Sequence, residues 1–549
     1  SRRPCHVPSS CWTPFLPVLN GEMAVQSAGD RAWVSRGSVT RQGALERVQP
    51  TRTPTAGGLD PVVVAAFAIV VSAAGAARPS LWFDEAATIS AGTRSVPELW
   101  RMLGNIDAVH GLYYLLMHGW FAVFPATEFW TRLPGCLAVG AAAAGVVVLG
   151  RQFSSRTVAV SAGIVFSILP RITWAGIEAR PYALSTACAV WLTVLVVASA
   201  RRDRTWAWVG YGVALAVSTV LNVFVVLIVL PHALTVVRIA RRRSTVFWWA
   251  GWCAAALVAL TPFMLFGRTQ IAQVRWISPL SPETLVEIVY EQYFDLSAAF
   301  AVTAGALLVL TIALRRFALL DNGTRILGTI SAAWIVLPTV VLVLYSAIAE
   351  PIYYPRYLCY TSPAVALLLA VCIAALVRSR DRVTAVLAVL ALAATPNYLF
   401  TQRGPYAKEG MDFSQIADLI TERAAPGDCL VLDNTVTWLP GPVRSVTAAR
   451  PHAYEKLVDP GRGRRAADRN RLWDAHIAIW AVADLVQHCT VLWTVSDRDH
   501  TLSDHDAGLP LDPGPRMSRA PAYQVPQRLG FHIVERWQFS FAQVTRSTR

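Results

Sequence analysis

Long apolar runs separated by short polar segments dominate residues 60–399. Most of these runs are close to the ~17–25 residues that a membrane-spanning helix needs. The runs cover residues 60–78, 129–150, 157–174, 182–200, 206–221, 222–238, 246–266, 297–314, 326–348, 358–377 and 383–399. The two runs between 206 and 238 follow each other with little room for a turn. The pattern predicts an all-α polytopic membrane bundle of about eleven spans.

Residues 111–125 form a further apolar segment that is short for a spanning helix and suits a helix lying at the membrane surface. The arginines favour this interpretation. If the N-terminus is cytoplasmic and 111–125 does not span, all arginine clusters between the runs fall in cytoplasmic loops, as the positive-inside rule expects. The clusters are Arg151 and Arg156; Arg201, Arg202 and Arg204; Arg238, Arg241, Arg242 and Arg243; Arg315, Arg316 and Arg325; and Arg378, Arg380 and Arg382. If 111–125 spans, the first two clusters lie outside.

Two polar regions flank the predicted transmembrane domain, residues 59–399. Residues 1–58 are rich in Arg, Pro, Ser, Thr and Gly, so we expect a disordered cytoplasmic N-terminal tail, within which Met23 is a possible start. Residues 400–549 follow the last run on the opposite side of the membrane. We therefore expect a multi-pass protein of the plasma membrane with an extracytoplasmic C-terminal domain.

The C-terminal domain alternates helical periodicity with short buried strands, which predicts an α/β fold with a parallel or mixed sheet. We expect helices at 413–424 and 472–486, strands at 429–434 and 490–496, a strand pair within 531–546, and loops at 440–470 and 497–522. Cys429 and Cys489 precede or begin the first two strands. Neighbouring strands would bring these cysteines together, so we predict a disulfide on the oxidising side of the membrane.

Composition and charge narrow the class of protein. Hydrophobic residues make up 54% of the 549 residues and charged residues only 15%, which excludes an ordinary soluble protein. The net charge is +14. Because the arginines lie between apolar runs and not on a basic face with aromatic platforms, they indicate membrane topology and not nucleic-acid binding. The cysteines show no metal-ligand spacing, and we predict no metal site among them; a requirement for a divalent metal is left open.

Unusual polar residues gather in the loops on the predicted outer face. Asp84 and Glu85 follow the first run within WFDEAAT, and charge so close to hydrocarbon is costly and tends to mark function. The other candidates are Asp107, His110, Glu178, Arg180, Arg268, Arg275, Tyr353, Tyr354 and Arg356. Carboxylates and arginines at one membrane face suggest a site for the chemistry of charged lipids.

The strings that carry these residues resemble the GT-C superfamily of membrane glycosyltransferases, and in particular the actinobacterial, PMT-like mannosyltransferases. The strings are WFDEAAT, DAVHGLYYLL, EARPYAL and YYPRYL, in this order over residues 59–400. The resemblance implies an enzyme that takes a sugar from a polyprenyl-phosphate carrier at the outer membrane face. No Gly-rich phosphate loop is present, and a lipid-linked donor agrees with that absence.

The chemistry of such a transfer suggests a role for each candidate. A carboxylate can deprotonate the acceptor hydroxyl, and we assign this to Asp84 with Glu85 beside it. An arginine can neutralise the leaving phosphate through bidentate hydrogen bonds, and we assign this to Arg356. The remaining predicted substrate-binding residues are Asp107, His110, Glu178, Arg180, Tyr353 and Tyr354.

Each assignment competes with a purely structural role for the same residue. Asp84 could cap a helix that starts at Ala86. Glu85 could be structural, or could hold the acceptor. Asp107 and His110 could be polar residues of the interface, and Glu178 could form a local ion pair with Arg180. Tyr353 and Tyr354 could belong to the aromatic belt at the membrane surface. The phosphate contact could come from Arg268 or Arg275 in place of Arg356.

The predicted function is transfer of a sugar, with mannose preferred, to a glycolipid or glycan of the cell envelope. The predicted partners are the polyprenyl-phosphate donor, the acceptor and membrane lipids, with no cofactor and no nucleic acid. A decaprenyl-phosphate arabinofuranosyltransferase is the alternative enzyme. A lipid or sugar-lipid transporter is the alternative from another class, but the chain lacks the internal repeats that such transporters often show.

Overall fold

The computed structural model describes residues 58–202, 205–434, 442–499, 509–511 and 521–549. The predicted tail, apart from its last residue, and Arg204 lie outside the described residues.

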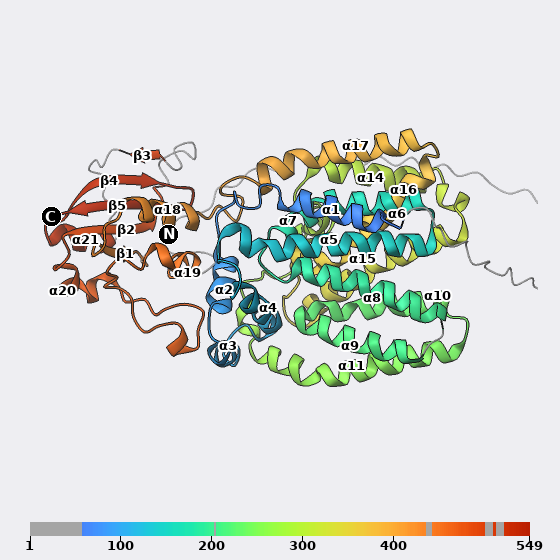
Figure 1. The fold of residues 1–549 in the computed structure, drawn as a ribbon, viewed down its shortest axis with the longest axis horizontal. Helices are drawn as coiled ribbons and strands as arrows, with labels where there is room; N and C mark the ends of the chain where they lie inside the picture. Colours follow the sequence, from blue (N-terminus) through green and yellow to red (C-terminus); the bar gives the residue numbers. More distant parts are fainter. Residues whose placement is uncertain (1–57, 203–204, 435–441, 500–508, 512–520) are drawn as a thin grey trace, which may run out of the picture. The chain divides into compact units, whose positions relative to one another are not determined.

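Each of the apolar runs forms a helix, and these helices lie side by side in a bundle (Figure 1). The bundle helices are α1 (Asp60–Ala73), α5 (Glu128–Phe153), α6 (Arg156–Ile168), α7 (Pro170–Gly176), α8 (Tyr182–Arg202), α9 (Thr205–Leu221), α10 (Val229–Ile239), α11 (Arg243–Thr269), α14 (Ala298–Ala313), α15 (Asn322–Ile348), α16 (Ser362–Leu376) and α17 (Arg380–Pro396). Short 3-10 helices precede α10 (Val223–Ile228) and α16 (Pro355–Thr361).

Among the described residues, six helices are long and apolar enough to cross a membrane, or up to eight if each of two bent pairs counts as one span. The chain is therefore a multi-pass membrane protein. The expected count of about eleven is not reached by this criterion because three runs form shorter apolar helices. These are α1, α9 and the segment Val223–Ile239.

A break between α6 and α7 helps to place two candidate residues, Glu178 and Arg180. Leu169, the residue before Pro170, has an extended backbone because the proline ring disfavours helical backbone in the residue before it. The two helices therefore meet at a bend of 61°. The loop after α7 carries Glu178 and Arg180 to the same end of the bundle as the start of α5.

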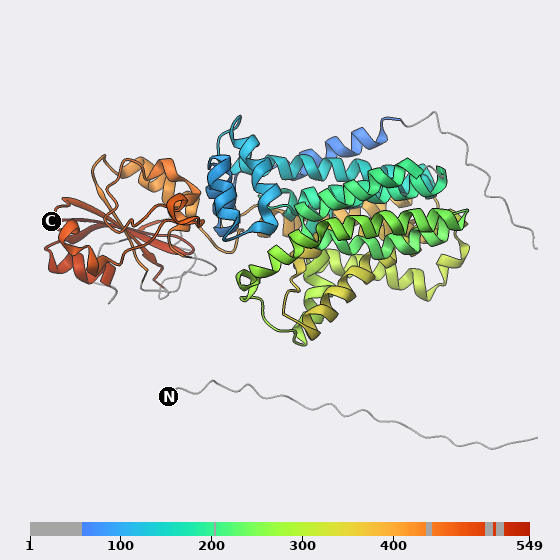
Figure 2. The ribbon, with the colours of Figure 1, turned by 90° about the horizontal axis from the view of Figure 1, so that it is seen from below.

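Three short helices lie at one end of the bundle (Figure 2): α2 (Phe83–Gly92), α3 (Val96–Leu103) and α4 (Gly111–Phe121). With 11 residues, α4 is only ~16 Å long and cannot cross a hydrocarbon core of ~30 Å. One side of α4 packs against Ala87 and Ala91 of α2. The expectation of a non-spanning helix at 111–125 agrees with this length.

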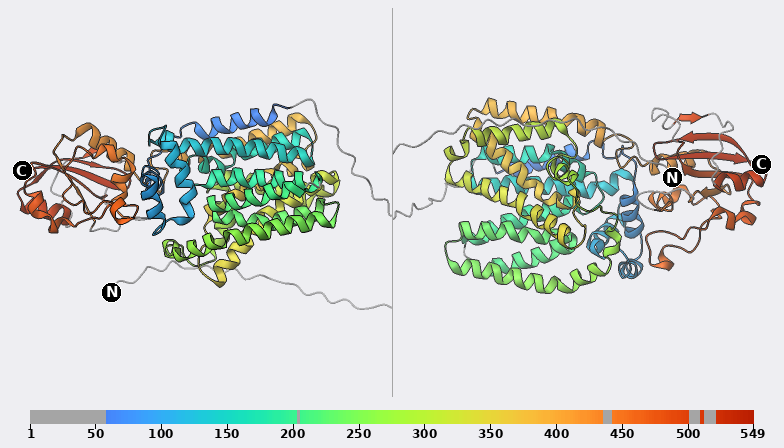
Figure 3. Two further views of the ribbon diagram at one scale, coloured as in Figure 1. Left: turned by 60° about the horizontal axis from the view of Figure 1, so that its bottom comes forward. Right: turned by 180° about the vertical axis from the view of Figure 1, so that it is seen from behind.

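The C-terminal part forms a mixed five-stranded sheet in the order β1-β2-β5-β4-β3 (Figure 3). The strands are β1 (Cys429–Leu432), β2 (Val491–Asp497), β3 (Leu509–Leu511), β4 (His532–Gln538) and β5 (Ala542–Thr548). β1 and β2 are parallel, and the other neighbours are antiparallel. The mixed sheet that the sequence predicts is confirmed.

Helices cover both faces of this sheet because side chains alternate along each strand. Leu430 and Leu432 pack with α18 (Phe413–Arg423) and α19 (Ser445–Ala449). Val431, from the other face of β1, packs with α20 (Ala483–Val486) and α21 (Pro521–Arg528). The first of these cores also contains Ala86 and Ile89 of α2. The helix that carries Asp84 and Glu85 is thus held between α4 and the C-terminal domain.

The predicted disulfide between Cys429 and Cys489 is confirmed, with a Cα–Cα distance of 6.0 Å. The predicted helix at 472–486 is wrong over most of its length. Only Ile479–Ala481 and Ala483–Val486 are helical. The preceding segment is extended because its backbone pairs with residues 461–464, and Trp473 packs against Phe83 at 5.3 Å between ring centroids. The strand β3 lies in a segment predicted as loop.

Candidate active site

Asp84 and Glu85 lie in the first turn of α2, where the helix dipole favours carboxylates. The helix begins at Phe83, and Trp82 is its N-cap residue. The alternative that Asp84 caps a helix starting at Ala86 is therefore wrong. Neighbouring residues of a helix point about 100° apart, so the two carboxylates reach different partners.

The Asp84 carboxylate lies between two arginines from distant parts of the chain. Arg180 donates a hydrogen bond to Oδ1 at 2.8 Å, and Arg356 lies 3.6 Å from Oδ2. Burial opposes ionisation, but the charges of Arg180 and Arg356 outweigh it and lower the pKa of Asp84 to about 2. The site therefore holds an ionised carboxylate at neutral pH.

Of the two arginines, Arg356 makes the longer contact with Asp84. It lies in the 3-10 helix Pro355–Thr361, directly before α16. Its guanidinium carbon lies 4.7 Å from the ring centroid of Tyr354, 5.4 Å from that of Trp82 and 5.8 Å from that of Trp276. Cation–π contacts of this kind hold the planar group in place. Its buried Nε has no hydrogen-bond partner among the described residues, so donor capacity is left over.

Asp107 and His110 lie beside the same cluster. Tyr114 donates to Asp107 at 2.6 Å and accepts from Arg180 at 2.8 Å, which joins Asp107 to Asp84 through two side chains. Burial and the nearby Arg180 charge lower the pKa of His110 to about 4, so its imidazole is neutral at pH 7. The buried Nδ1 of His110 has no partner within the described part of the chain. Like Nε of Arg356, it is a polar atom that a bound molecule could satisfy.

Glu85 has a different environment and is 0% exposed. Arg132 of α5 holds both of its oxygens, at 2.8 and 2.6 Å. The same guanidinium donates to the carbonyl oxygens of Ala76, Pro79 and Ser80. This fully bonded pair fastens the start of α2 to α5 and to the chain that leads into it. The geometry favours the structural role for Glu85.

Glu178 is also fully buried, and it does not form the local ion pair with Arg180. Its oxygens accept from Trp82 Nε1 at 2.9 Å and from Lys408 Nζ at 2.6 Å. Burial raises the pKa of Glu178 against the opposing effect of the Lys408 ammonium. Glu178 thus holds the ring of Trp82, and that ring contacts Arg356. Glu178 therefore supports the site indirectly, through Trp82.

The remaining candidate residues lie in different environments. Tyr353 is buried away from the Asp84 cluster and donates to Gln292 at 3.0 Å, whereas Tyr354 contacts Arg356. Arg268 and Arg275 are exposed at the end of α11 and just beyond it. The structure therefore brings together Asp84, Asp107, His110, Arg180, Tyr354 and Arg356, and it places Glu85, Glu178 and Tyr353 in supporting contacts.

Sequence reasoning missed several residues that build the site. Arg132 stands at the start of an apolar run, and a charge there could have been noticed as costly unless paired. Lys408 is one of only two lysines in an arginine-rich chain. Tyr114 lies within the string DAVHGLYYLL but has no charge. No group of three or more His, Cys, Asp or Glu residues that could hold a metal occurs among the described residues.

No family model and no curated protein matches the chain. The structure is similar to that of ArnT from Cupriavidus metallidurans bound to undecaprenyl phosphate, with 13% sequence identity, a TM-score of 0.51, and coverage of 88% of this chain and 97% of that one. The apo form of the same ArnT gives 12% identity, a TM-score of 0.52 and the same coverage, 88% and 97%. At these identities the similarity shows the fold. ArnT belongs to the GT-C superfamily of membrane glycosyltransferases, so the GT-C resemblance is confirmed at the level of fold, and the chain has the fold of that superfamily.

Proposed function

We propose that this protein is a membrane glycosyltransferase that moves mannose from a polyprenyl-phosphate carrier to a glycolipid or glycan of the cell envelope. One observation carries the proposal: the ionised carboxylate of Asp84 lies 3.6 Å from a guanidinium that retains an unused donor. Transfer from a sugar phosphate needs a proton acceptor for the incoming hydroxyl and a cation for the departing phosphate. The site supplies both within one cluster.

Donor binding would also tune Asp84. The charges of Arg180 and Arg356 hold the pKa of Asp84 at about 2, which makes it a weak base. A donor phosphate that takes hydrogen bonds from Arg356 would offset one of those charges. The basicity of Asp84 would then rise only when the donor is in place, whereas Arg180 would keep the carboxylate oriented. The proposal of a PMT-like subtype and of mannose rests on the family resemblance that the four sequence strings carry.

The test is to profile lipids and envelope glycans of cells that lack the gene, with and without the wild-type copy. The proposal expects loss of a mannose-containing product and accumulation of its acceptor. Loss of arabinofuranose in place of mannose would favour the alternative enzyme. Unchanged linkages with a lipid-linked sugar retained on the inner leaflet would favour a transporter.

We expect substitution of Arg356 to weaken binding of the donor and to leave the fold intact. Arg356→Lys keeps the charge but loses the planar fork, so the apparent donor affinity should fall by about tenfold, and Arg356→Ala should lose roughly tenfold more. The measurement is the KM for the polyprenyl-phosphate donor with purified variants. Arg423→Lys, at an exposed arginine of α18, is a matched control. Unchanged donor KM in both Arg356 variants would move the phosphate contact to another cation.

We propose that the N-terminus is cytoplasmic and residues 400–549 are extracytoplasmic. The Cys429–Cys489 disulfide supports this orientation because disulfides persist in oxidising compartments. A reporter that is active only outside the cell, fused after Arg549, should therefore be fully active. The same reporter fused after Arg382 should be inactive. Activity at the level of a cytoplasmic control for the first fusion would reverse the topology.

A further inference from the structure

A cavity of about 290 Å³ lies between α6, α16 and α17. It belongs to the end of the bundle remote from Asp84. Arg356 lies in the 3-10 helix that precedes α16, and the cavity is at the other end of α16, which is 15 residues or ~22 Å long. The cavity is therefore separate from the candidate active site.

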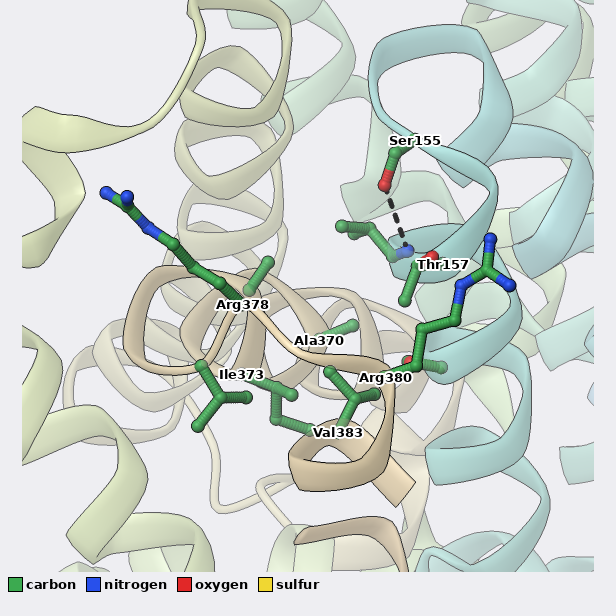
Figure 4. A pocket seen from close by; sticks show the side chains of 11 residues that line it. Ser155, Thr157, Ala370, Ile373, Arg378, Arg380 and Val383 are labelled. Atoms are coloured by element: carbon green, nitrogen blue, oxygen red, sulfur yellow. Dashed lines mark hydrogen bonds between the residues drawn. The ribbon is translucent and has the colours of Figure 1, made fainter. Parts of the chain in front are cut away.

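The cavity combines an apolar floor with a cationic rim. Figure 4 shows Ala370, Ile373 and Val383 gathered together, with Arg378 to one side and Arg380 to the other, near Thr157. α16 ends at Leu376, and the chain turns back through an extended Val377 into α17. This turn carries both arginines to the mouth of the cavity.

The rim keeps a net positive charge, although Asp381 lies next to Arg380 in the first turn of α17. Arg378 and Arg380 are exposed, and neither forms an ion pair with a described residue. At the same end of the bundle, by contrast, Arg151 and Arg156 share the carboxylate of Asp60. The N-termini of α6 and α17 meet at the cavity and add partial positive charge. The side chains of Ser155 and Ser379 each accept a hydrogen bond from one N–H group of these turns. The two arginines and the remaining N–H groups together favour a phosphate.

The surroundings of the cavity point to a lipid as the source of that phosphate. Only 22% of the apolar stretch within Arg380–Gln402, which contains α17, is buried by protein, so most of its apolar surface must meet hydrocarbon. An acyl chain lying along α17 would place its headgroup at the helix end, beside Arg380. Basic pockets between transmembrane helices bind anionic headgroups in this way.

We propose that this cavity binds the phosphate diester of an anionic phospholipid, in the leaflet opposite the Asp84 site. Arg378 and Arg380 hold the phosphate, and the apolar floor accommodates the glycerol and the first carbons of an acyl chain. A zwitterionic headgroup binds less well because its cationic end meets the two guanidinium groups.

Native mass spectrometry of the full chain in detergent tests the proposal, with phosphatidylglycerol and phosphatidylcholine as probes. Arg378→Gln/Arg380→Gln should lower the affinity for phosphatidylglycerol at one saturable site by about tenfold to thirtyfold. The difference in affinity between phosphatidylglycerol and phosphatidylcholine should become smaller. Arg325→Gln/Arg382→Gln removes the same charge outside the cavity and should change the affinity less than about twofold. Ala374→Phe fills the cavity with the arginines intact and should weaken binding as well.

Three results would overturn the proposal. Equal affinity of the wild-type protein for both lipids would remove the role of headgroup charge. Equal loss in the two double variants would reduce binding to non-specific surface attraction. Displacement of the lipid by millimolar inorganic phosphate would identify a small-anion site. If Ala374→Phe does not fold, the two arginine pairs still decide between these outcomes.

Discussion

Asp84→Asn should lower the rate of sugar transfer by about 10²–10⁴-fold, because it removes the proposed general base and keeps nearly the same shape. The variant should still fold. It also weakens the contact with Arg180 at 2.8 Å, so a stability loss of about 1–3 kcal/mol is expected. The measurement is turnover per folded molecule, with the folded fraction taken from thermal unfolding in detergent.

Arg180→Lys is the matched control for this prediction. It disturbs the same ion pair from the other side and leaves the Asp84 carboxylate intact. If Asp84 only anchors Arg180, the two variants should lose comparable turnover. If Asp84 is the base, Asp84→Asn should be at least about tenfold slower than Arg180→Lys. Turnover of Asp84→Asn within a few-fold of the wild type would remove Asp84 from the mechanism.

The pH dependence follows from the direction of the pKa shift. The folded pKa of Asp84 lies below its ordinary value, so its contribution to stability is complete above about pH 4 and disappears as the pH falls toward 2. The free enzyme therefore keeps Asp84 ionised between about pH 5 and 8. We expect no acid limb from this residue in the kcat/KM profile over that range.

Glu85→Gln should destabilise the protein by about 3–5 kcal/mol, because it leaves the Arg132 guanidinium buried without a counter-charge. Turnover by the molecules that remain folded should stay within a few-fold of the wild type. Unfolding of the purified variant in detergent, followed by intrinsic fluorescence, provides the measurement.

A double variant separates the buried pair from a catalytic role. Glu85→Gln/Arg132→Gln removes both charges and should cost less than the sum of the two single changes. Glu455→Gln removes an exposed carboxylate and should shift stability by less than about 0.5 kcal/mol. A stable Glu85→Gln variant with turnover as low as that of Asp84→Asn would return Glu85 to the chemistry.

Much of the fold is predictable from local pattern. The apolar runs form helices because a helix satisfies its backbone hydrogen bonds within one segment, as hydrocarbon requires. The strands of the C-terminal sheet follow from short buried segments. The prediction of a helix at 472–486 was wrong because long-range contacts, including that of Trp473 with Phe83, override the helical periodicity of the segment. Tertiary packing of this kind cannot be read from spacing.

The sequence predicted several of the residues that the structure brings together, but it did not predict their pairings. Asp84 and Glu85 are adjacent in sequence and equally charged, so the sequence alone could not predict which arginine each of them binds. The structure separates them through Arg180 and Arg132, which are 96 and 47 residues away, respectively. Similarly, Glu178 and Arg180 look like a local pair, but each is satisfied by a partner from another part of the chain.

The most direct test is transfer of labelled mannose by the purified wild-type protein in lipid vesicles, with a polyprenyl-phosphate donor in one arm and a soluble nucleotide-sugar donor in the other. We predict product from the lipid-linked donor, none above background from the nucleotide sugar, and none above background from either donor with Asp84→Asn. Transfer from the nucleotide sugar, or equal transfer by the wild type and Asp84→Asn, would contradict the proposed function.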